Sequence, residues 1–485
     1  MVMNFKTKSL LAGVALLVVL AAAALLCRQP QQSQPKSERA EVVILSTNDM
    51  HAKIDEFPRL VTAVRECRDT VCTILVDAGD RWTGDGYVDL ADRRRPIIDL
   101  MNHLGYDVAT LGNHEFDVGQ ATLDAALQLC RFKVLCANMQ SDTELLDDVA
   151  GTARVETPDG VTIDFAGVVT NFNNGHPDGN DDTFKGLRFE SPQECAVARA
   201  AEMTGDVKVL LSHMGDDKDM ALAARGCGYD IIISGHTHAL VDTLINGTLI
   251  GQTQNKLKNV GVTRITLEGG RICSTSYENI PLARYAKDAE TERMVEQIKD
   301  NPEMKVVVGR AANRATHVGL ANWQTRVLKQ KFGVEVALYH YGGVRLQGLE
   351  AGEVTVKDIY DNEPFFSPIC TARMTPQQLR RMIVSKYNDT KNSKESHRVD
   401  IFASTPYDIV TTAEDVAVDV RFAQLEEGVR YTVALPEYVA NNYGDFECEE
   451  LRVTPHTAYG LDIEYMKQHS PVVFDNTPKQ RIVRR

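Results

Sequence analysis

A short polar stretch that follows an apolar run, Gly112-Asn113-His114-Glu115-Phe116-Asp117, carries an amide, an imidazole and two carboxylates. Residues 106–111 before it predict a strand, and the glycine allows a tight turn. Asn and His are also common in ordinary turns, so this loop alone does not indicate a catalytic site. Four further stretches have the same form, with metal-type ligands directly after an apolar run: Thr47-Asn48-Asp49-Met50-His51, Asp77-Ala78-Gly79-Asp80, Ser212-His213 and Gly235-His236-Thr237-His238.

Together these stretches contain enough ligand-type side chains for two metal ions. The parallel strands of a doubly wound sheet end along one edge, so loops that are distant in sequence meet there. One tetrahedral zinc takes four ligands, whereas two divalent ions that share a carboxylate need more. The ligand-type residues are two aspartates, one asparagine and four histidines: Asp49, Asp80, Asn113, His51, His213, His236 and His238. The sequence therefore predicts a two-metal site at the edge of a sheet.

The order of the motifs resembles that of the calcineurin-like dimetal phosphoesterases, and specifically of the 5'-nucleotidase family. The motifs are Asp49-x-His51, Gly79-Asp80, Gly112-Asn113-His114-Glu115, His213 and Gly235-His236-x-His238. The resemblance implies that one ion is held by Asp49, His51, Asp80 and His238. It implies that the other is held by Asp80, Asn113, His213 and His236, with Asp80 as the bridge. His114 and Asp117 match the family's catalytic pair. Such sites accept Zn, Mn, Co or Fe, and metal availability decides among them.

The elements that would position these loops alternate between strand and helix from residue 41 to about residue 283, which predicts the α/β layered class. The resemblance implies a four-layer metallophosphoesterase sandwich in residues 41–284. A charged segment, residues 285–305, predicts a linking helix between two domains. Residues 306–466 predict a smaller α/β or α+β domain. Residues 467–485 are basic and without pattern, and we expect a solvated or disordered tail there.

The carboxyl-terminal half resembles the substrate-binding domain of the same family. Gly342-Gly343-Val344-Arg345 and Pro364-Phe365 follow the family's order. The resemblance implies that Arg314 and Arg345 grip phosphate, for which guanidinium groups are well suited. It also implies that Phe365 and Tyr438 sandwich a base, although both could be ordinary core residues. Three positions depart from the family pattern: His340 and Ser367 each replace an asparagine, and Asn441-Asn442-Tyr443-Gly444-Asp445 replaces a glycine-rich loop.

Charge and composition narrow the class of partner. The composition, with 43% hydrophobic and 25% charged residues, is ordinary for a globular protein. A net charge of −14 argues against a nucleic-acid polymer, because binding one requires a basic surface. A small phosphoester substrate remains compatible with this charge, since metals and a few arginines set the local potential.

The amino-terminal segment, residues 1–40, predicts export. Lys6 and Lys8 precede an apolar run over residues 10–27, and a polar stretch follows. This pattern is typical of a secretory signal, and the run is also just long enough to remain as a membrane anchor. Cys27 suggests a lipoprotein, but Leu26 before it is bulkier than the residue such processing takes. We expect a periplasmic or cell-surface protein, in which ten cysteines permit disulfides without demanding them.

These observations predict an exported, metal-dependent phosphoric ester hydrolase that releases phosphate from nucleoside 5'-monophosphates. A nucleoside 2',3'-cyclic phosphodiesterase and a UDP-sugar hydrolase are alternatives, because the same two-ion centre can cleave those substrates. A non-catalytic surface binding protein is the alternative from another class. The complete ligand set argues against it, because a binding protein has no need to keep one. The sequence does not indicate an oligomeric state.

Overall fold

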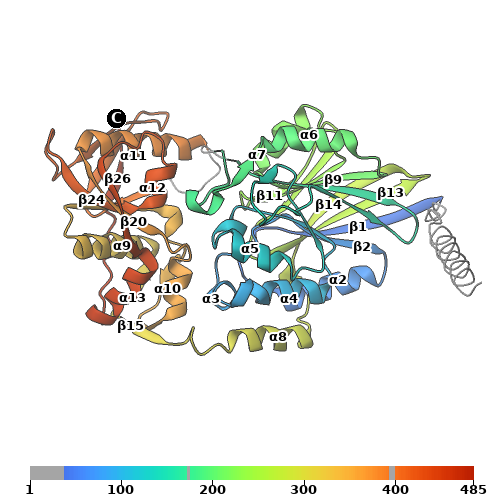
Figure 1. Ribbon diagram of the computed structural model, residues 1–485, viewed down its shortest axis with the longest axis horizontal. Helices are drawn as coiled ribbons and strands as arrows, with labels where there is room; N and C mark the ends of the chain where they lie inside the picture. Colours follow the sequence, from blue (N-terminus) through green and yellow to red (C-terminus); the bar gives the residue numbers. More distant parts are fainter. Residues whose placement is uncertain (1–37, 172–174, 393–398) are drawn as a thin grey trace, which may run out of the picture.

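The computed structural model describes residues 38–171, 175–392 and 399–485, which form two domains joined by a connecting segment (Figure 1). The expected signal or anchor, including residues 10–27, lies outside the described residues. Among the described residues, no helix combines the length and apolar character needed to cross a membrane.

Two six-stranded sheets form the first domain. One has the order β14 (Arg271–Pro281), β13 (Asn259–Glu268), β1 (Arg39–Thr47), β2 (Cys72–Asp77), β3 (Val108–Thr110) and β4 (Lys133–Leu135). The other has the order β11 (Leu240–Ile245), β12 (Thr248–Thr253), β10 (Ile231–Ser234), β9 (Val207–His213), β7 (Thr162–Val169) and β6 (Thr152–Glu156). Strands β1 to β4 are parallel, as are β7, β9, β10 and β12.

The sheets pack face to face with helices on both outer sides, which confirms the predicted four-layer sandwich. Strand β1 shows why the first sheet is covered on both faces. Successive side chains of a strand point to opposite faces, and the apolar side chains of β1 are buried on both. Val42 and Ile44 enter the core between the sheets, whereas Val43 and Leu45 enter the core beneath the helices. The helices beside the first sheet are α2 (Phe57–Arg68), α4 (Arg95–Leu104) and α5 (Gln120–Leu127), and those beside the second are α6 (Pro192–Glu202) and α7 (Asp216–Ala224).

The linking segment contains α8 (Ala289–Lys299), which packs on the first domain. Val295 is buried in the core beneath the helices, and Met294 and Ile298 pack against it. The segment that is free to link the domains is therefore shorter than residues 285–305, and it lies between α8 and β15 (Val307–Ala311).

A five-stranded mixed sheet forms the centre of the second domain. Its order is β21 (Ile401–Ala403), β17 (Val336–His340), β24 (Tyr431–Pro436), β20 (Pro368–Met374) and β25 (Glu449–Thr457). Its helices are α9 (His317–Phe332), α10 (Val356–Asn362), α11 (Pro376–Asn392), α12 (Glu437–Asn442) and α13 (Ala458–His469). Short strand pairs join β15 to β19 (Gly352–Thr355) and β16 (Ala315–Thr316) to β18 (Gly348–Leu349).

The prediction of a separate tail at residues 467–485 was wrong. β26 (Gln480–Arg484) pairs in parallel with β22 (Tyr407–Thr411), which also pairs with β23 (Ala417–Phe422). Val472 and Phe474 are buried in the core of the second domain. β26 is an edge strand whose side chains are mostly exposed, so its sequence lacks the apolar alternation of a half-buried strand.

Contacts between the domains lie beside the strand ends. Asp85 of the first domain is within 3.3 Å of Lys53 and also within 3.3 Å of Lys357 of α10. The Tyr438 hydroxyl of α12 donates to Asp178 Oδ2 of the first domain at 2.8 Å. All nine cysteines among the described residues are free thiols.

Candidate metal centre

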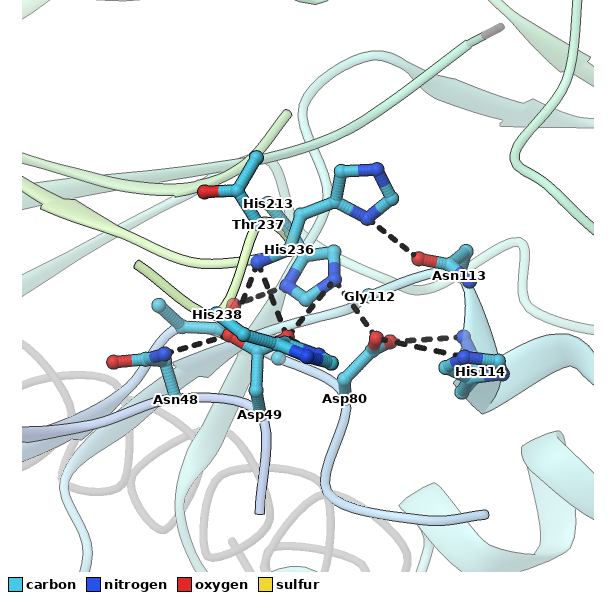
Figure 2. A network of polar contacts seen from close by, with 12 residues as sticks. Asn48, Asp49, Asp80, Gly112, Asn113, His114, His213, His236, Thr237 and His238 are labelled. Atoms are coloured by element: carbon cyan, nitrogen blue, oxygen red, sulfur yellow. Dashed lines mark hydrogen bonds and ion pairs between the residues drawn. The ribbon is translucent and has the colours of Figure 1, made fainter. Parts of the chain in front are cut away.

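The seven predicted metal ligands converge where the parallel strands of both sheets end. Figure 2 labels all of them except His51. Each follows one strand directly or closely. The first sheet supplies its ligands after β1, β2 and β3, and the second supplies them at the end of β9 and after β10. The sequence predicted one sheet edge, whereas the structure brings the edges of two facing sheets together.

Their ligand atoms form overlapping groups. Nitrogen or oxygen atoms of Asp49, His51 and His238 lie within 4.8 Å of one another, and so do those of Asp80, His213 and His236. Each group contains three of the four residues that the family resemblance assigns to one ion. Asn113 joins the second group, because its Oδ1 is 3.1 Å from Nδ1 of His236. Asp80 also forms a third group with His51 and His114, so it lies centrally enough to bridge two ions.

Backbone carbonyls orient two of the histidines for metal binding. Nδ1 of His51 is 3.1 Å from the carbonyl oxygen of Thr83, and Nδ1 of His213 is 2.6 Å from that of Ala78. A ring nitrogen beside a carbonyl carries the proton, which leaves the lone pair on Nε2. Nε2 of His51 is 2.9 Å from Nε2 of His238, and Nε2 of His213 is 3.0 Å from Asp80 Oδ2. The donor set therefore fits divalent cations of the borderline type.

Five of the seven ligands adopt backbone conformations that non-glycine residues rarely occupy. Their φ angles are positive: Asp49 49°, His51 48°, Asp80 55°, His236 77° and His238 55°. Such conformations cost about 1–3 kcal/mol each and persist only where the surroundings impose them. After β1, β2 and β10, the backbone thus turns in a way that aims these side chains into the centre.

A buried carboxylate that the sequence did not single out holds two of these loops together. Glu115 accepts hydrogen bonds from the backbone N–H groups of Asp80 and Arg81, at 3.0 and 2.9 Å, and from that of Gly112. A side chain at Gly112 would collide with Asp80 Oδ1. Glu115 stood in the motif itself, but only the structure shows that it binds backbone rather than metal.

Burial and neighbouring charges set opposite protonation tendencies within the centre. Burial and the charge of His213 lower the pKa of His236 to about 3. Burial alone would lower the pKa of His213, but Asp80 and Asp49 outweigh it and raise the pKa to about 10. Burial opposes ionisation of Asp80, yet His213 and His114 hold its pKa well below the usual range. These pKa directions favour a proton between His213 and Asp80, and ligands of this kind release such a proton when they bind metal.

His114 and Asp117 form a hydrogen-bonded pair beside these ligands. Nδ1 of His114 is 2.8 Å from Asp117 Oδ2, and the His114 backbone N–H donates to Asp80 Oδ1 at 2.9 Å. Burial alone would lower the pKa of His114, but Asp117 and Asp80 outweigh it and raise the pKa to about 9. This raised pKa favours the protonated form of the ring at neutral pH.

A cavity of about 250 Å³ opens from this pair into the second domain. Arg345, Phe365 and Tyr438 line it together with His114 and Asp117. The Phe365 ring stacks on that of His114 with centroids 5.8 Å apart, and the Arg345 guanidinium lies 5.5 Å from the Phe365 centroid. Three of the four predicted substrate-binding residues thus lie beside the seven proposed metal ligands, whose site we call the metal edge.

Arg314, the fourth, lies elsewhere in this structure. Its side chain is 63% exposed, pairs with Glu350 at 2.8 Å and does not line the cavity. His340, one of the departures from the family pattern, does line the cavity and stacks on Tyr438 with centroids 4.8 Å apart. Sequence reasoning did not single out the cavity residues Asp178, Lys386 and Asp400. They carry no motif, and chain folding alone brings them there.

Comparison with known proteins agrees with both halves of this description. Residues 42–240 match the family of calcineurin-like phosphoesterases, and residues 297–450 match the 5'-nucleotidase C-terminal domain. The trifunctional nucleotide phosphoesterase protein YfkN of Bacillus subtilis is 25% identical over 75% of this chain and 30% of its own length. The uncharacterized metallophosphoesterase YunD of the same bacterium is 24% identical, over 88% of this chain and 90% of YunD.

A solved structure has the same fold along almost the whole chain. The 5'-nucleotidase precursor from Thermus thermophilus superposes with a TM-score of 0.77 at 20% identity, over 91% of this chain and 99% of that one. The chain spans about a third of the length of the first curated relatives that it matches.

Proposed function

We propose that this protein releases phosphate from nucleoside 5'-monophosphates. The chain combines a calcineurin-like phosphoesterase domain with a 5'-nucleotidase C-terminal domain, as expected of a metal-dependent phosphoric ester hydrolase. The observation that carries the proposal is the cavity. It begins at His114 and Asp117 and continues along Arg345, Phe365 and Tyr438 of the second domain. A phosphate at the metal edge would thus have room beside it for a nucleoside.

The proposed metal ligands are the members of the two atom groups, with Asp80 shared between both ions and Asn113 added to the second group. Asp49, His51, Asp80 and His238 would hold one ion, and Asp80, Asn113, His213 and His236 the other. When bound, two such ions neutralise phosphate charge and make a water molecule a stronger nucleophile at neutral pH.

His114 is the proposed proton donor. Asp117 accepts from Nδ1 and so fixes the ring with Nε2 toward the metal edge, where it lies 4.0 Å from Asp80 Oδ2. In the reaction, the oxygen of water forms a new bond to phosphorus and the bond to the 5' oxygen breaks. The leaving oxygen takes the proton from His114 Nε2, and the proton lost by water returns to the solvent and then to the ring.

The second domain is proposed to bind the organic half of the substrate. The Arg345 guanidinium suits phosphate oxygens, and its position over Phe365 places it beside His114. The rings of Phe365 and Tyr438 offer faces on which a base can stack.

Phosphate release by the purified protein tests the proposal. After metal stripping and restoration of Mn, Co or Zn, we expect fast, metal-dependent release of phosphate from AMP and slower release from an aryl phosphate. Hydrolysis of 2',3'-cyclic AMP gives a nucleoside monophosphate, and hydrolysis of UDP-glucose gives UMP and glucose 1-phosphate. These two reactions are therefore followed by chromatography of their products, and we expect both to be slower than the reaction with AMP. Activity confined to the cyclic or aryl phosphates would keep the phosphohydrolase and reject the nucleotide substrate. No turnover with any metal would favour a binding protein.

Export is a second part of the proposal, supported by the apolar run over residues 10–27. Fractionation of cells that express the full chain, compared with cells that express residues 38–485, tests it. We expect only the full chain outside the cytoplasm or at the membrane, and equal distribution of the two would reject export by this segment.

A further inference from the structure

Thr83 occupies a strained position between the metal ligands and the His114–Asp117 pair. Its side chain is fully buried and its φ is 66°. Among the described non-glycine residues with positive φ, Thr83 alone has a β-branched side chain. A β-branched residue in this region is a clear outlier, and such strain is retained where the surroundings enforce it.

The surroundings of Thr83 do enforce this conformation. The carboxylate of Asp89 accepts from the backbone N–H groups of Thr83, Gly84 and Asp85, at distances of 2.9, 2.7 and 2.9 Å. A side chain at Gly84 would meet the carbonyl oxygen of His51 at 2.6 Å, so only glycine lets the loop lie against that residue. The loop therefore presents Thr83 in one orientation.

The two polar groups of Thr83 face two different parts of the site. Its carbonyl oxygen is 3.1 Å from Nδ1 of His51, a proposed metal ligand. Its hydroxyl donates at 2.7 Å to Asp117 Oδ2, the same oxygen that lies 2.8 Å from Nδ1 of His114. One residue thus contacts both the metal ligand and the partner of the proton donor.

The direction of the hydroxyl hydrogen bond is fixed by Arg94. Nη1 of Arg94, a buried guanidinium, donates to Thr83 Oγ1 at 3.2 Å. A guanidinium only donates, so the hydroxyl accepts from Arg94 and its own proton is left for Asp117. Arg94 thus donates to Thr83, and Thr83 donates to Asp117. The Asp117 carboxylate also accepts from the Nδ1–H of His114.

We propose that Thr83 is a positioning residue for proton transfer: its hydroxyl holds the Asp117 carboxylate in the orientation that keeps the Nε2 proton of His114 toward the leaving oxygen. This inference rests on the proposed function, because it requires His114 to protonate a leaving group. Thr83 acts through Asp117 and does not line the cavity. Its effect should therefore depend on how much the leaving group needs a proton.

Three variants of Thr83 test this dependence in the holoenzyme. Thr83→Val keeps the shape and loses the hydroxyl, Thr83→Ala loses the hydroxyl and relieves the crowding of the β-branch, and Thr83→Ser keeps the hydroxyl. For AMP and phenyl phosphate, we expect Thr83→Val and Thr83→Ala to lower kcat by about 10- to 100-fold, the usual cost of losing a residue that orients an active-site side chain. Thr83→Ser should keep kcat within about threefold of the native value. For 2,4-dinitrophenyl phosphate, whose leaving group needs no proton, all three should remain within about threefold.

The metal content of each variant and its temperature of thermal unfolding distinguish this positioning role from a structural role. All three variants keep the backbone carbonyl that orients His51, so two ions per chain should remain. An equal loss of kcat for all three substrates in both Val and Ala, whether or not metal is lost with it, would overturn the proposal.

A double-mutant cycle with His114→Asn gives the decisive readout. If Thr83 acts through the pair, Thr83→Val costs about 10- to 100-fold in the native background and nothing further in the His114→Asn background. The same loss in both backgrounds would overturn the role of Thr83. If His114→Asn alone slows all three leaving groups equally, the assignment of His114 as proton donor fails, and the inference about Thr83 fails with it.

Discussion

The two halves of the site are built by different means. At the metal edge, side chains follow strands directly or closely, and strained backbone turns aim five of them inward. In the cavity of the second domain, Arg345 follows a short turn after β17, Phe365 follows α10, and Tyr438 lies in α12. Their positions depend on ring stacking and on the contact of Tyr438 with Asp178 of the other domain.

This difference separates the chemistry from the choice of substrate. Backbone hydrogen bonds and buried carboxylates such as Glu115 fix the metal edge within one domain. The cavity is complete only while two domains are in contact. Changes at the metal edge should therefore affect every phosphoester, whereas changes in the cavity should affect substrates according to their organic half.

The largest effect is expected from Asp80→Asn, which removes the proposed bridging charge while keeping the size of the side chain. We expect turnover of every phosphoester to fall by more than the roughly 100- to 10,000-fold that loss of a general acid costs, because both ions depend on this charge. Metal analysis should show fewer than two ions per chain. Asp164→Asn is the control, because Asp164 is also buried and charge-paired, with Arg154, but lies at the start of β7. Near-normal activity of Asp80→Asn would reject the assignment of the bridge.

A smaller effect is expected from His114→Asn, which removes the proton donor. The loss of a general acid costs about 100- to 10,000-fold in rate. Two ions should stay bound, because the two groups assigned to the ions do not include this ring. Loss of metal from the variant would instead make His114 a ligand, and the metal edge would then contain no separate proton donor.

Tyr438→Leu should change only substrates that carry a base. We expect KM for AMP to rise about tenfold, because stacking on an aromatic ring contributes about 1–3 kcal/mol per base. The variant should hydrolyse glycerol phosphate, which has no ring, with the same kcat and KM as the native protein. Tyr438→Phe keeps the ring and removes the hydrogen bond to Asp178, so it separates stacking from domain contact. An equal slowing of both substrates by Tyr438→Leu would show that the cavity and the metal edge are not independent.

The same contrast governs what the sequence could predict. Asp49, Asp80, His213 and their partners could be found because a strand end is a local pattern that the chain repeats. Glu115 stood within a motif and Thr83 beside one, but their roles depend on contacts with other loops, which no local pattern reveals. Asp178 and Asp400 come to the cavity from different domains. β26 was missed because an exposed edge strand lacks apolar alternation.

Arg314→Ala should have the smallest effect, and it tests whether the family resemblance or the observed position of Arg314 decides its role. Resemblance assigned phosphate binding to Arg314 as well as to Arg345. The structure places Arg314 in an exposed pair with Glu350, and such pairs contribute about 0–1 kcal/mol to stability. We therefore expect kcat and KM for AMP to stay within about twofold of the native values. Arg345→Ala is the matched control, and it should raise KM about tenfold or more, because a hydrogen bond to a charged group contributes about 1.5–3 kcal/mol. A comparable rise in KM for both variants would mean that the second domain also binds substrate in another orientation, which brings Arg314 to the phosphate.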